Sequence, residues 1–162
     1  MGGGEPRLAA REVERVERIM IGKLASVAVT GDKSLAVGWD DGFAAAVDFA
    51  ELIAAHKVLA PLKNKSEFVR VKLSRDKWSL EWPCGIDFGA QQLRRWAEEQ
   101  AGEAMRVADF RAWMDEHGLT QEAAAQALGL SRRMIAYYLS GEKIIPKTVL
   151  LATEGWAARV EA

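Results

Sequence analysis

The residues best suited to chemistry lie near the C-terminal end of the chain. Between Ser131 and Lys147 there are four basic side chains and one acidic one. Two of them, Arg132 and Arg133, are adjacent and directly follow the serine. A guanidinium group can donate two hydrogen bonds to the O6 and N7 atoms of guanine, so an exposed helix that begins with arginines is suited to reading DNA. The plainer interpretation of two neighbouring arginines is a solvated helix face.

The carboxylates of the first half of the chain have structural explanations. Asp40 and Asp41 stand before Gly42 in a pattern typical of a hairpin turn, and Asp48 is placed to cap a helix. Asp87 can cap or bind the backbone after a Trp-Pro pair. We therefore favour structural roles for these carboxylates over catalytic ones.

The histidines and the cysteine form no catalytic or metal-binding pattern. His56 and His117 fall in different halves of the chain, and neither has neighbouring ligands at the spacing of a metal site. Cys84 is the only cysteine and has no evident histidine base, so we expect a buried or incidental thiol. The sequence predicts no enzyme, no metal site and no cofactor. A pocket joining Asp48, Asp87 and Cys84 would favour an enzyme instead.

Length and composition set the outer bounds. The chain has 162 residues, with 22 Lys and Arg against 23 Asp and Glu, a net charge of -1. Hydrophobic residues make up 49% and charged residues 28%, which suits one or two globular domains. No apolar run approaches the ~18 residues that cross a bilayer, and residues 1–6 lack a signal-peptide pattern. We expect a cytoplasmic protein without membrane contact, and the near-zero charge argues at first against a nucleic-acid partner.

The character of the sequence changes near Ala101–Gly102 and predicts two domains. Residues 1–18 read as a charged N-terminal arm, residues 19–100 as a small domain of β-hairpins with helices, and residues 101–162 as a helical domain. The expected fold class is α+β, with a C-terminal all-α bundle.

The elements expected in the first domain are short. Helices are predicted at 49–55 and 91–100, and strands at 24–30, 34–39, 43–48, 68–73 and 78–82. Pro83-Cys84-Gly85 is expected to stop the sheet. One face of these strands is expected to be buried, and it comprises Val27, Val29, Leu35, Val37, Val47, Val69, Val71 and Leu80.

The second domain contains two predicted helices separated by three residues. Thr120 is placed to cap a helix over residues 121–128, and Gly129 suits the left-handed conformation that ends it. Ser131 is placed to cap the next helix, over residues 132–139. This is helix-turn-helix spacing, which packs two helices at ~90–120° and leaves the second exposed.

Residues 106–158 resemble the DNA-binding domain of the lambda-repressor and Cro class, of the xenobiotic-response-element type. The residues that carry the resemblance at fixed spacing are Leu119, Thr120, Gln121, Ala125, Gly129, Ser131 and Ile135, closed by Ser140-Gly141. The resemblance implies a helical bundle, with flanking helices that we expect at residues 109–117 and from Pro146 onward. It also implies that the second helix lies in the DNA major groove.

The same resemblance implies which residues touch DNA. The predicted DNA-binding residues are Gln121, Ser131, Arg132, Arg133, Ala136, Tyr137, Lys143 and Lys147. Because residues 101–162 hold seven basic and eight acidic side chains, we expect one copy to bind weakly and a homodimer to bind two half-sites.

Residues 20–93 resemble an uncharacterised bacterial domain of unknown function. The shared features are the Asp-Gly hairpin, Val47-Asp48-Phe49, Pro61-Leu62 and the closing Trp82-Pro83-Cys84-Gly85-Ile86-Asp87-Phe88. The family pattern has Asn where this chain has Cys84, and Leu where it has Phe49 and Phe88. Members often look like partners or antitoxins of small toxins, so the resemblance implies a toxin-like protein partner.

Two functions are therefore open. The first is a sequence-specific transcriptional regulator that binds double-stranded DNA, with an autoregulating antitoxin as a specific version. The alternative is a protein-interaction module, an antitoxin-like partner binder without DNA binding. Salt-dependent binding to DNA distinguishes the two.

Overall fold

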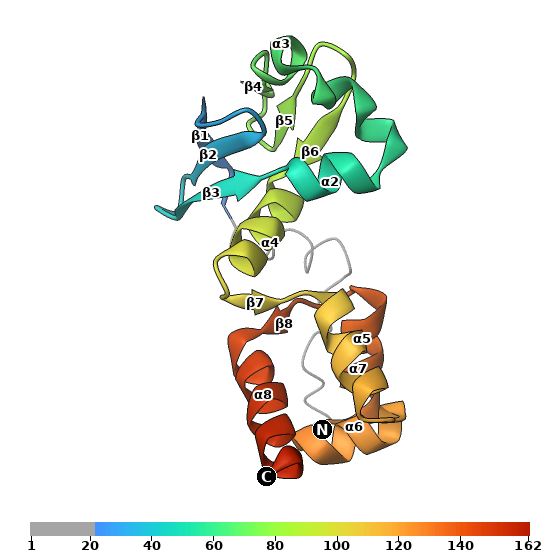
Figure 1. Ribbon diagram of the computed structural model, residues 1–162. Coiled ribbons are helices and arrows are strands. Elements are labelled where there is room, and N and C mark those ends of the chain that lie inside the picture. Colours follow the sequence, from blue (N-terminus) through green and yellow to red (C-terminus); the bar gives the residue numbers. More distant parts are fainter. Residues whose placement is uncertain (1–21) are drawn as a thin grey trace, which may run out of the picture. The chain divides into compact units, whose positions relative to one another are not determined.

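The computed structural model describes residues 22–162, and the predicted arm at residues 1–18 lies outside them. The chain divides into two compact units, one ending at Ala97 and one running from Glu98 to Ala162. Each unit has its own hydrophobic core. Figure 1 labels the helices and strands of both units. The fold is α+β, as the sequence predicts.

Three antiparallel strands open the N-terminal unit. They are β1 (Leu24–Val29), β2 (Ser34–Trp39) and β3 (Ala44–Asp48), in the order β1-β2-β3. The Asp-Gly turn joins β2 to β3, and Gly42 has a φ of 90°, a conformation that favours glycine. The three predicted strands are confirmed to within one residue at each end.

Helical segments and a second small sheet complete this unit. In chain order they are α2 (Ala50–Ala55), the 3-10 helix η1 (Lys57–Lys63), α3 (Lys65–Phe68), β4 (Lys72–Leu73), β5 (Ser79–Glu81), β6 (Asp87–Gly89) and α4 (Ala90–Gln100). The cap position of α2 is Phe49 rather than Asp48. Asp48 still serves the start of the helix, because its Oδ1 accepts a hydrogen bond from the N–H of Ala50 at 2.8 Å.

The strand predicted over residues 68–73 is wrong for its first four residues. Phe68 ends α3, which begins after Asn64, whose Oδ1 accepts from the N–H of Ser66 at 3.0 Å. Val69 follows the helix and is 46% exposed, whereas the sequence pattern places it in the core. The overlooked signal is Asn64, a favoured N-cap residue directly before a helix.

The Pro-Cys-Gly segment also departs from expectation, because it turns the chain instead of ending the sheet. Gly85 has a φ of 94°, and its N–H donates to the carbonyl of Trp82 at 3.0 Å. The chain then returns as β6, which pairs with β5 in the order β4-β5-β6. A three-residue strand is too short to show a hydrophobic period.

The core of the N-terminal unit is organised around the ring of Phe49. Its centroid lies 5.7–6.2 Å from those of Phe68, Trp82, Phe88 and Trp96. The indole N–H of Trp82 donates to the carbonyl of Phe68 at 2.9 Å, so this buried tryptophan leaves no polar atom unpaired.

The predicted core is half confirmed. Leu35, Val37, Val47 and Leu80 are buried, Val27 and Val71 are half-buried, and Val29 and Val69 are exposed. The two exposed valines stand at the end of β1 and just after α3, where the chain turns away from the sheet.

The C-terminal unit is a bundle of four helices with one short ladder. Its elements are β7 (Ala104–Met105), α5 (Val107–Glu116), α6 (Gln121–Leu128), α7 (Arg132–Ser140), β8 (Ile145–Pro146) and α8 (Lys147–Glu161). The antiparallel pairing of β7 with β8 is not predicted by the sequence. It ties the start of the unit to the start of α8.

Asp41→Asn should lower the free energy of unfolding of the N-terminal unit by about 1 kcal/mol near neutral pH. The N–H of Phe43 donates to the Asp41 carboxylate at 3.1 Å, and Arg94 pairs with it at 3.0 Å. The Phe43 hydrogen bond and then Arg94 hold the pKa of Asp41 below its ordinary value of 3.8. Because the ionised form is the one stabilised, the loss should be full above that ordinary pKa and should fade as the pH falls through the native pKa.

Urea unfolding at about pH 7 and about pH 3 measures this difference. Asp87→Asn is the control, since it removes an exposed carboxylate from β6 of the same unit. A loss that is equal at both pH values would contradict the electrostatic origin.

Candidate nucleic-acid interface

The turn between α6 and α7 is built from local backbone chemistry. The Oγ1 of Thr120 accepts from the N–H of Ala123 at 3.1 Å and caps the start of α6. At the other end Gly129 has a φ of 68°, and the N–H of Leu130 donates to the carbonyl of Ala125 at 2.9 Å. These are the bonds of a Schellman motif, in which a left-handed glycine ends a helix and satisfies its last carbonyls.

The second helix, α7, begins directly after this turn. The Oγ of Ser131 accepts from the N–H of Met134 at 3.1 Å, as the capping prediction requires. The helix ends at Gly141, whose φ is 78°. The predicted bounds of both helices are confirmed to within one residue, because caps and left-handed glycines mark helix ends locally.

The two helices meet through small residues. Ala124 and Ala125 of α6 are buried in the same cluster as Ile135 and Tyr138 of α7. Methyl side chains let two helix backbones approach closely, and Ile135 and Tyr138 mark the buried inner face of α7. The ring of Tyr138 lies 5.9 Å from that of Phe110 on α5, and burial raises the pKa of the Tyr138 hydroxyl.

The outer face of α7 is exposed, and it carries four of the predicted DNA-binding residues. Arg132, Arg133 and Ala136 are exposed and Tyr137 is half-buried. These positions share one side of the helix, because residues three and four apart lie on the same face. The structure thus brings these four side chains together.

Tyr137 is the centre of a small polar cluster on this face. The Nε of Arg133 donates to the Tyr137 hydroxyl at 2.7 Å. The guanidinium carbon of Arg133 and the ammonium of Lys143 lie 5.4 Å and 5.0 Å from the centroid of the ring. Two cations are therefore held on one aromatic side chain, within the range of cation–π attraction.

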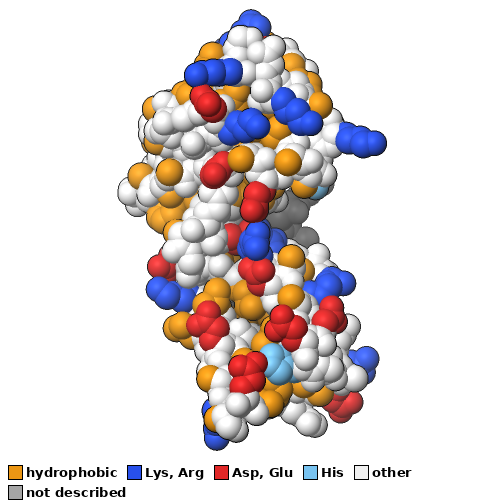
Figure 2. Space-filling model, in the orientation of Figure 1, with side chains coloured by type: hydrophobic (Ala, Val, Ile, Leu, Met, Phe, Trp, Pro, Cys, Tyr) orange, Lys and Arg blue, Asp and Glu red, His pale blue; other side chains and the backbone are white. Residues whose placement is uncertain are grey.

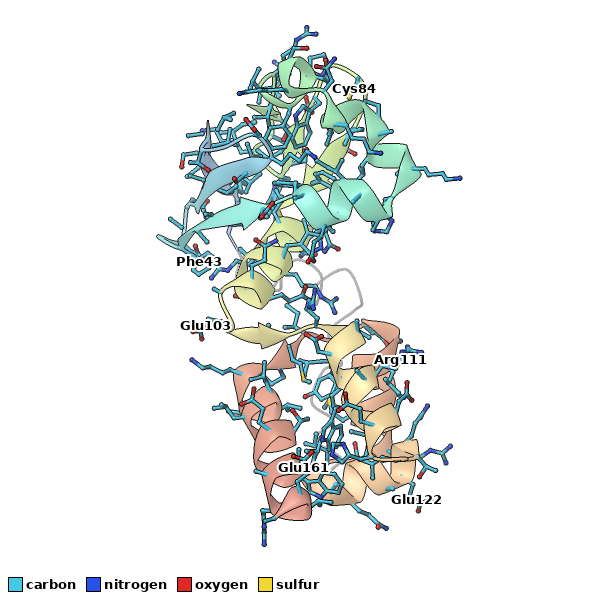
Figure 3. All side chains as sticks on the ribbon, viewed as in Figure 1. Phe43, Cys84, Glu103, Arg111, Glu122 and Glu161 are labelled. Atoms are coloured by element: carbon cyan, nitrogen blue, oxygen red, sulfur yellow. The ribbon has the colours of Figure 1, made fainter. Side chains whose placement is uncertain are left out.

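The remaining predicted residues are placed less uniformly. Gln121 is the exposed first residue of α6, and Ser131 is exposed at the start of α7. Lys147 begins α8, and its ammonium is paired with Glu103 at 3.2 Å. Figure 3 labels Glu103 beside β7. The structure therefore joins Lys147 to the β7–β8 end of the unit rather than to the Tyr137 cluster.

One further cation approaches α7 that the sequence pattern does not single out. Arg111, on α5, donates from Nη2 to the carbonyl of Leu139 at 3.4 Å (Figure 3). This carbonyl lies in the last turn of α7, where the partial charge of a helix is negative. The helical period of the sequence places Arg111 on a polar face of its own helix. It does not identify the partner on α7, which only the tertiary structure shows.

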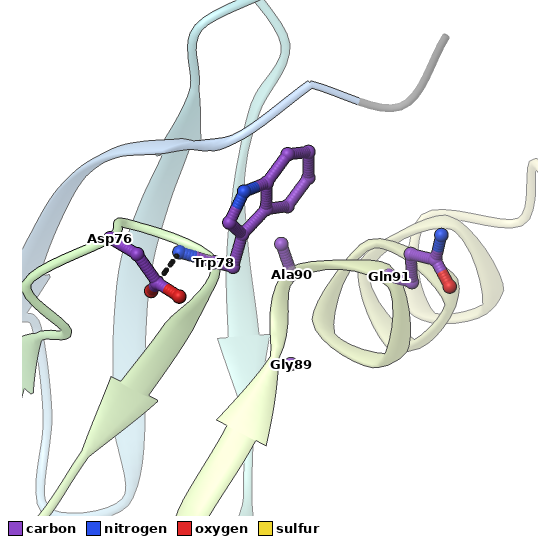
Figure 4. A pocket seen from close by; sticks show the side chains of 5 residues that line it. All are labelled: Asp76, Trp78, Gly89, Ala90 and Gln91. Atoms are coloured by element: carbon purple, nitrogen blue, oxygen red, sulfur yellow. Dashed lines mark hydrogen bonds between the residues drawn. The ribbon is translucent and has the colours of Figure 1, made fainter. Parts of the chain in front are cut away.

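Asp48, Cys84 and Asp87, the residues considered for catalysis, line neither of two pockets in the N-terminal unit, of which one is shown in Figure 4. That pocket is lined by Asp76, Trp78, Gly89, Ala90 and Gln91 (Figure 4). The Asp76 carboxylate is used by its turn, since it accepts from the Oγ of Ser74 at 2.7 Å and from the N–H of Trp78 at 3.1 Å. These bonds, the Ser74 bond first, lower the pKa of Asp76.

Cys84 differs from a buried thiol, because the structure exposes it. Its backbone N–H donates to Oε1 of Glu67 at 3.1 Å. Within residues 22–162, no three His, Cys, Asp or Glu side chains gather closely enough to hold a metal ion.

Together these features define a helix-turn-helix domain that follows a small α+β domain. Residues 110–152 match the helix-turn-helix family, here of the lambda-repressor and Cro type, and residues 24–99 match the family described as a protein of unknown function, DUF2442. In both parts the resemblance read from the sequence is confirmed.

The chain is also similar to a protein of known crystal structure from Nitrosomonas europaea ATCC 19718, which is provisionally described as DNA-binding. The two are 37% identical over 84% of this chain and 86% of the other, with a TM-score of 0.50. The chain therefore belongs to the family of that protein.

No curated protein matches the chain. Among the helices of the described residues, none combines the length and the apolar character that crossing a membrane requires.

Gly129→Ala and Gly155→Ala should change stability in opposite directions. Gly129 has a φ of 68°, where a β-carbon is strained, so the substitution should cost about 1 kcal/mol. Gly155 is an exposed residue inside α8 with open space where an alanine methyl group would stand, so alanine there should add about 0.5–1 kcal/mol.

Urea unfolding of the two variants tests the role of the turn. The pair changes the same atoms, so a difference in sign isolates backbone conformation. If Gly129→Ala were neutral, the left-handed residue would not be what ends α6.

Proposed function

We propose that the C-terminal unit binds double-stranded DNA and that the protein is a sequence-specific transcriptional regulator. The observation that carries this proposal is the exposed face of α7, which presents Arg132 and Arg133 while Ile135 and Tyr138 bury the opposite face. A helix of this kind fits the major groove of DNA. The description of the Nitrosomonas europaea relative supports the proposal.

Arg132 and Arg133 are assigned to base edges. The side chain of Arg132 is exposed and has no hydrogen-bond or ion-pair partner among residues 22–162. Arg133 uses Nε for the Tyr137 hydroxyl, which leaves both terminal Nη groups for the O6 and N7 atoms of a guanine. Tyr137 is thus a positioning residue, because it fixes the direction of the Arg133 side chain before DNA arrives.

Phosphate contacts are assigned to residues around this face. Lys143 is exposed beside Tyr137, and Gln121 lies at the start of α6, where backbone N–H groups and the helix dipole favour an anion. Lys147 contributes only if DNA displaces Glu103 from its ammonium. Ser131 and Ala136 complete the predicted surface at the start and middle of α7.

The charge of the unit favours two copies on one site. Residues 98–162 hold seven basic and ten acidic side chains. A single helix-turn-helix with this balance has little non-specific attraction for phosphates, so a homodimer on two half-sites is part of the proposal. A cytoplasmic location accompanies it.

An antitoxin that represses its own operon is a specific version of this proposal. It adds a toxin-like protein as partner of the N-terminal unit and assigns no catalytic role to Asp48, Cys84 or Asp87. A stoichiometric toxin-like partner found together with no DNA binding would instead favour the protein-interaction module.

Arg132→Ala should weaken binding to the operator by about 1–3 kcal/mol, a factor of roughly 5 to 150. The loss follows from removing a bidentate contact to guanine. Fluorescence anisotropy measures it on a duplex taken from the region upstream of the protein's own coding sequence, at low salt.

Arg159→Ala is the matched control, since it removes the same charge from an exposed position on α8. If both variants lose the same amount of operator affinity, the effect of Arg132→Ala comes from the change in net charge and not from a contact with guanine. If the unaltered protein shows no salt-dependent binding to this duplex, the proposed function fails.

Tyr137→Phe should weaken operator binding by about 0.5–1.5 kcal/mol, less than Arg133→Ala. It removes the hydroxyl that accepts from Arg133 and keeps the ring beside Lys143. The double variant should be no weaker than Arg133→Ala alone, because the hydroxyl acts through that arginine. Additive losses in the anisotropy measurement would contradict the positioning role.

A further inference from the structure

The N-terminal unit carries a concentration of positive charge that the helix-turn-helix function does not use. Residues 57–77, the basic segment, hold seven basic and two acidic side chains, a net charge of +5. The other described residues of this unit, 22–56 and 78–97, hold four basic and seven acidic ones. All seven cations of the basic segment are exposed. Figure 2 shows more Lys and Arg than Asp and Glu side chains on the face of this unit seen there.

Most of this charge is not neutralised by neighbours. Lys65 pairs with Asp32 at 2.9 Å, and Arg70 pairs with Glu67 at 3.4 Å. The other five have no ion-pair partner among residues 22–162, and they are Lys57, Lys63, Lys72, Arg75 and Lys77.

The five unpaired cations lie in the 3-10 helix η1, in the strand β4 and in the turn before β5. Lys57 and Lys63 are the two ends of η1, about 12 Å apart at the rise of a 3-10 helix. Lys72 lies in β4, and the other two lie in the turn that leads to β5.

That turn contains an unusual residue. Lys77 has a φ of 63°, the one positive value outside glycine in the described chain. Glycine or asparagine adopts this conformation at lower cost than lysine. A strained backbone position that nevertheless holds a cation is consistent with a functional requirement for the charge.

The chemistry of the segment suits phosphate better than a protein partner. Four of the five unpaired cations are Lys, which is depleted from protein–protein interfaces. The aromatic residue of the segment, Phe68, is fully buried, so it offers no exposed anchor of the kind that dominates such interfaces. Binding to a phosphate backbone requires charge and no apolar anchor.

We infer that the basic segment binds the phosphate backbone of double-stranded DNA independently of sequence. This inference rests on the proposed function, to which it adds a second contact surface on the same chain. The basic segment supplies the non-specific attraction for phosphates that residues 98–162, with seven basic and ten acidic side chains, lack. Because the two units are joined, a weak contact by either raises the effective DNA concentration at the other.

The test measures binding of the full chain to two duplexes of equal length, the upstream region and a random sequence, over a range of salt. One variant carries Lys57→Gln and Lys63→Gln, and a second carries Lys72→Gln and Arg75→Gln. The control carries Arg106→Gln and Arg159→Gln, which removes two exposed cations of the C-terminal unit that belong to neither surface. Circular dichroism checks that all three remain folded.

Each variant of the basic segment should bind DNA more weakly than the unaltered protein, and the loss of affinity should be the same factor for the upstream duplex and for the random duplex. The slope of log K against log salt should become shallower by about 0.9 for each phosphate that the segment no longer neutralises. The control should keep the slope of the unaltered protein. Unchanged slopes in both variants, or an equal change in the control, would overturn the inference.

The two proposals fail differently in this experiment. Loss of preference for the upstream duplex, with the segment-dependent slope retained, defeats the proposed function and leaves this inference standing. A preference that depends on Arg132 but a slope that ignores the basic segment defeats this inference alone. Absence of binding to either duplex defeats both.

Discussion

The close contact between α6 and α7 is the constraint on which the rest of the interface depends. Two buried alanines, Ala124 and Ala125, face the cluster that contains Ile135, and the left-handed Gly129 sets the angle at which the chain enters α7. Since α7 is held by one face, its other face is free to carry Arg132 and Arg133. A larger side chain at the alanines would separate the helices and would change where both arginines point.

The N-terminal unit is stabilised mainly by the packing of its aromatic side chains. Its strands are short, and the six-residue helix α2 is too short to be stable alone. The aromatic cluster around Phe49 supplies the cohesion, and the Trp82 indole is satisfied by a backbone carbonyl within it. Because aromatic burial holds this unit together from inside, η1, α3 and the turn before β5 are free to carry lysines on the outside. The proposed phosphate surface is a consequence of that arrangement.

Net charge describes this protein poorly. The total of -1 averages a basic segment of +5 with acidic surroundings in both units. Electrostatic attraction for a polyanion depends on how charge is distributed over a surface and falls off within about 10 Å at ordinary salt. A locally basic helix face and a separate basic segment therefore act on DNA even when the whole chain is close to neutral.

The sequence by itself determined the helix-turn-helix, because its signals are local. Thr120 and Ser131 bind N–H groups three residues ahead, and Gly129 ends α6 through its own φ, so the bounds of α6 and α7 follow without tertiary information. Only the tertiary structure decided the features that depend on contacts between residues distant in the sequence. A two-residue ladder such as β7–β8 exists because its partner, some 40 residues away, supplies the hydrogen bonds. The same holds for the Arg111 contact with α7 and the Glu103 pair of Lys147, since neither partner is near in sequence. The exposure of Val69 has both origins. The Asn64 cap is a local signal that the sequence contains, whereas the burial of Phe68 is tertiary, and together they favour a turn of helix over the strand that the apolar pattern predicts.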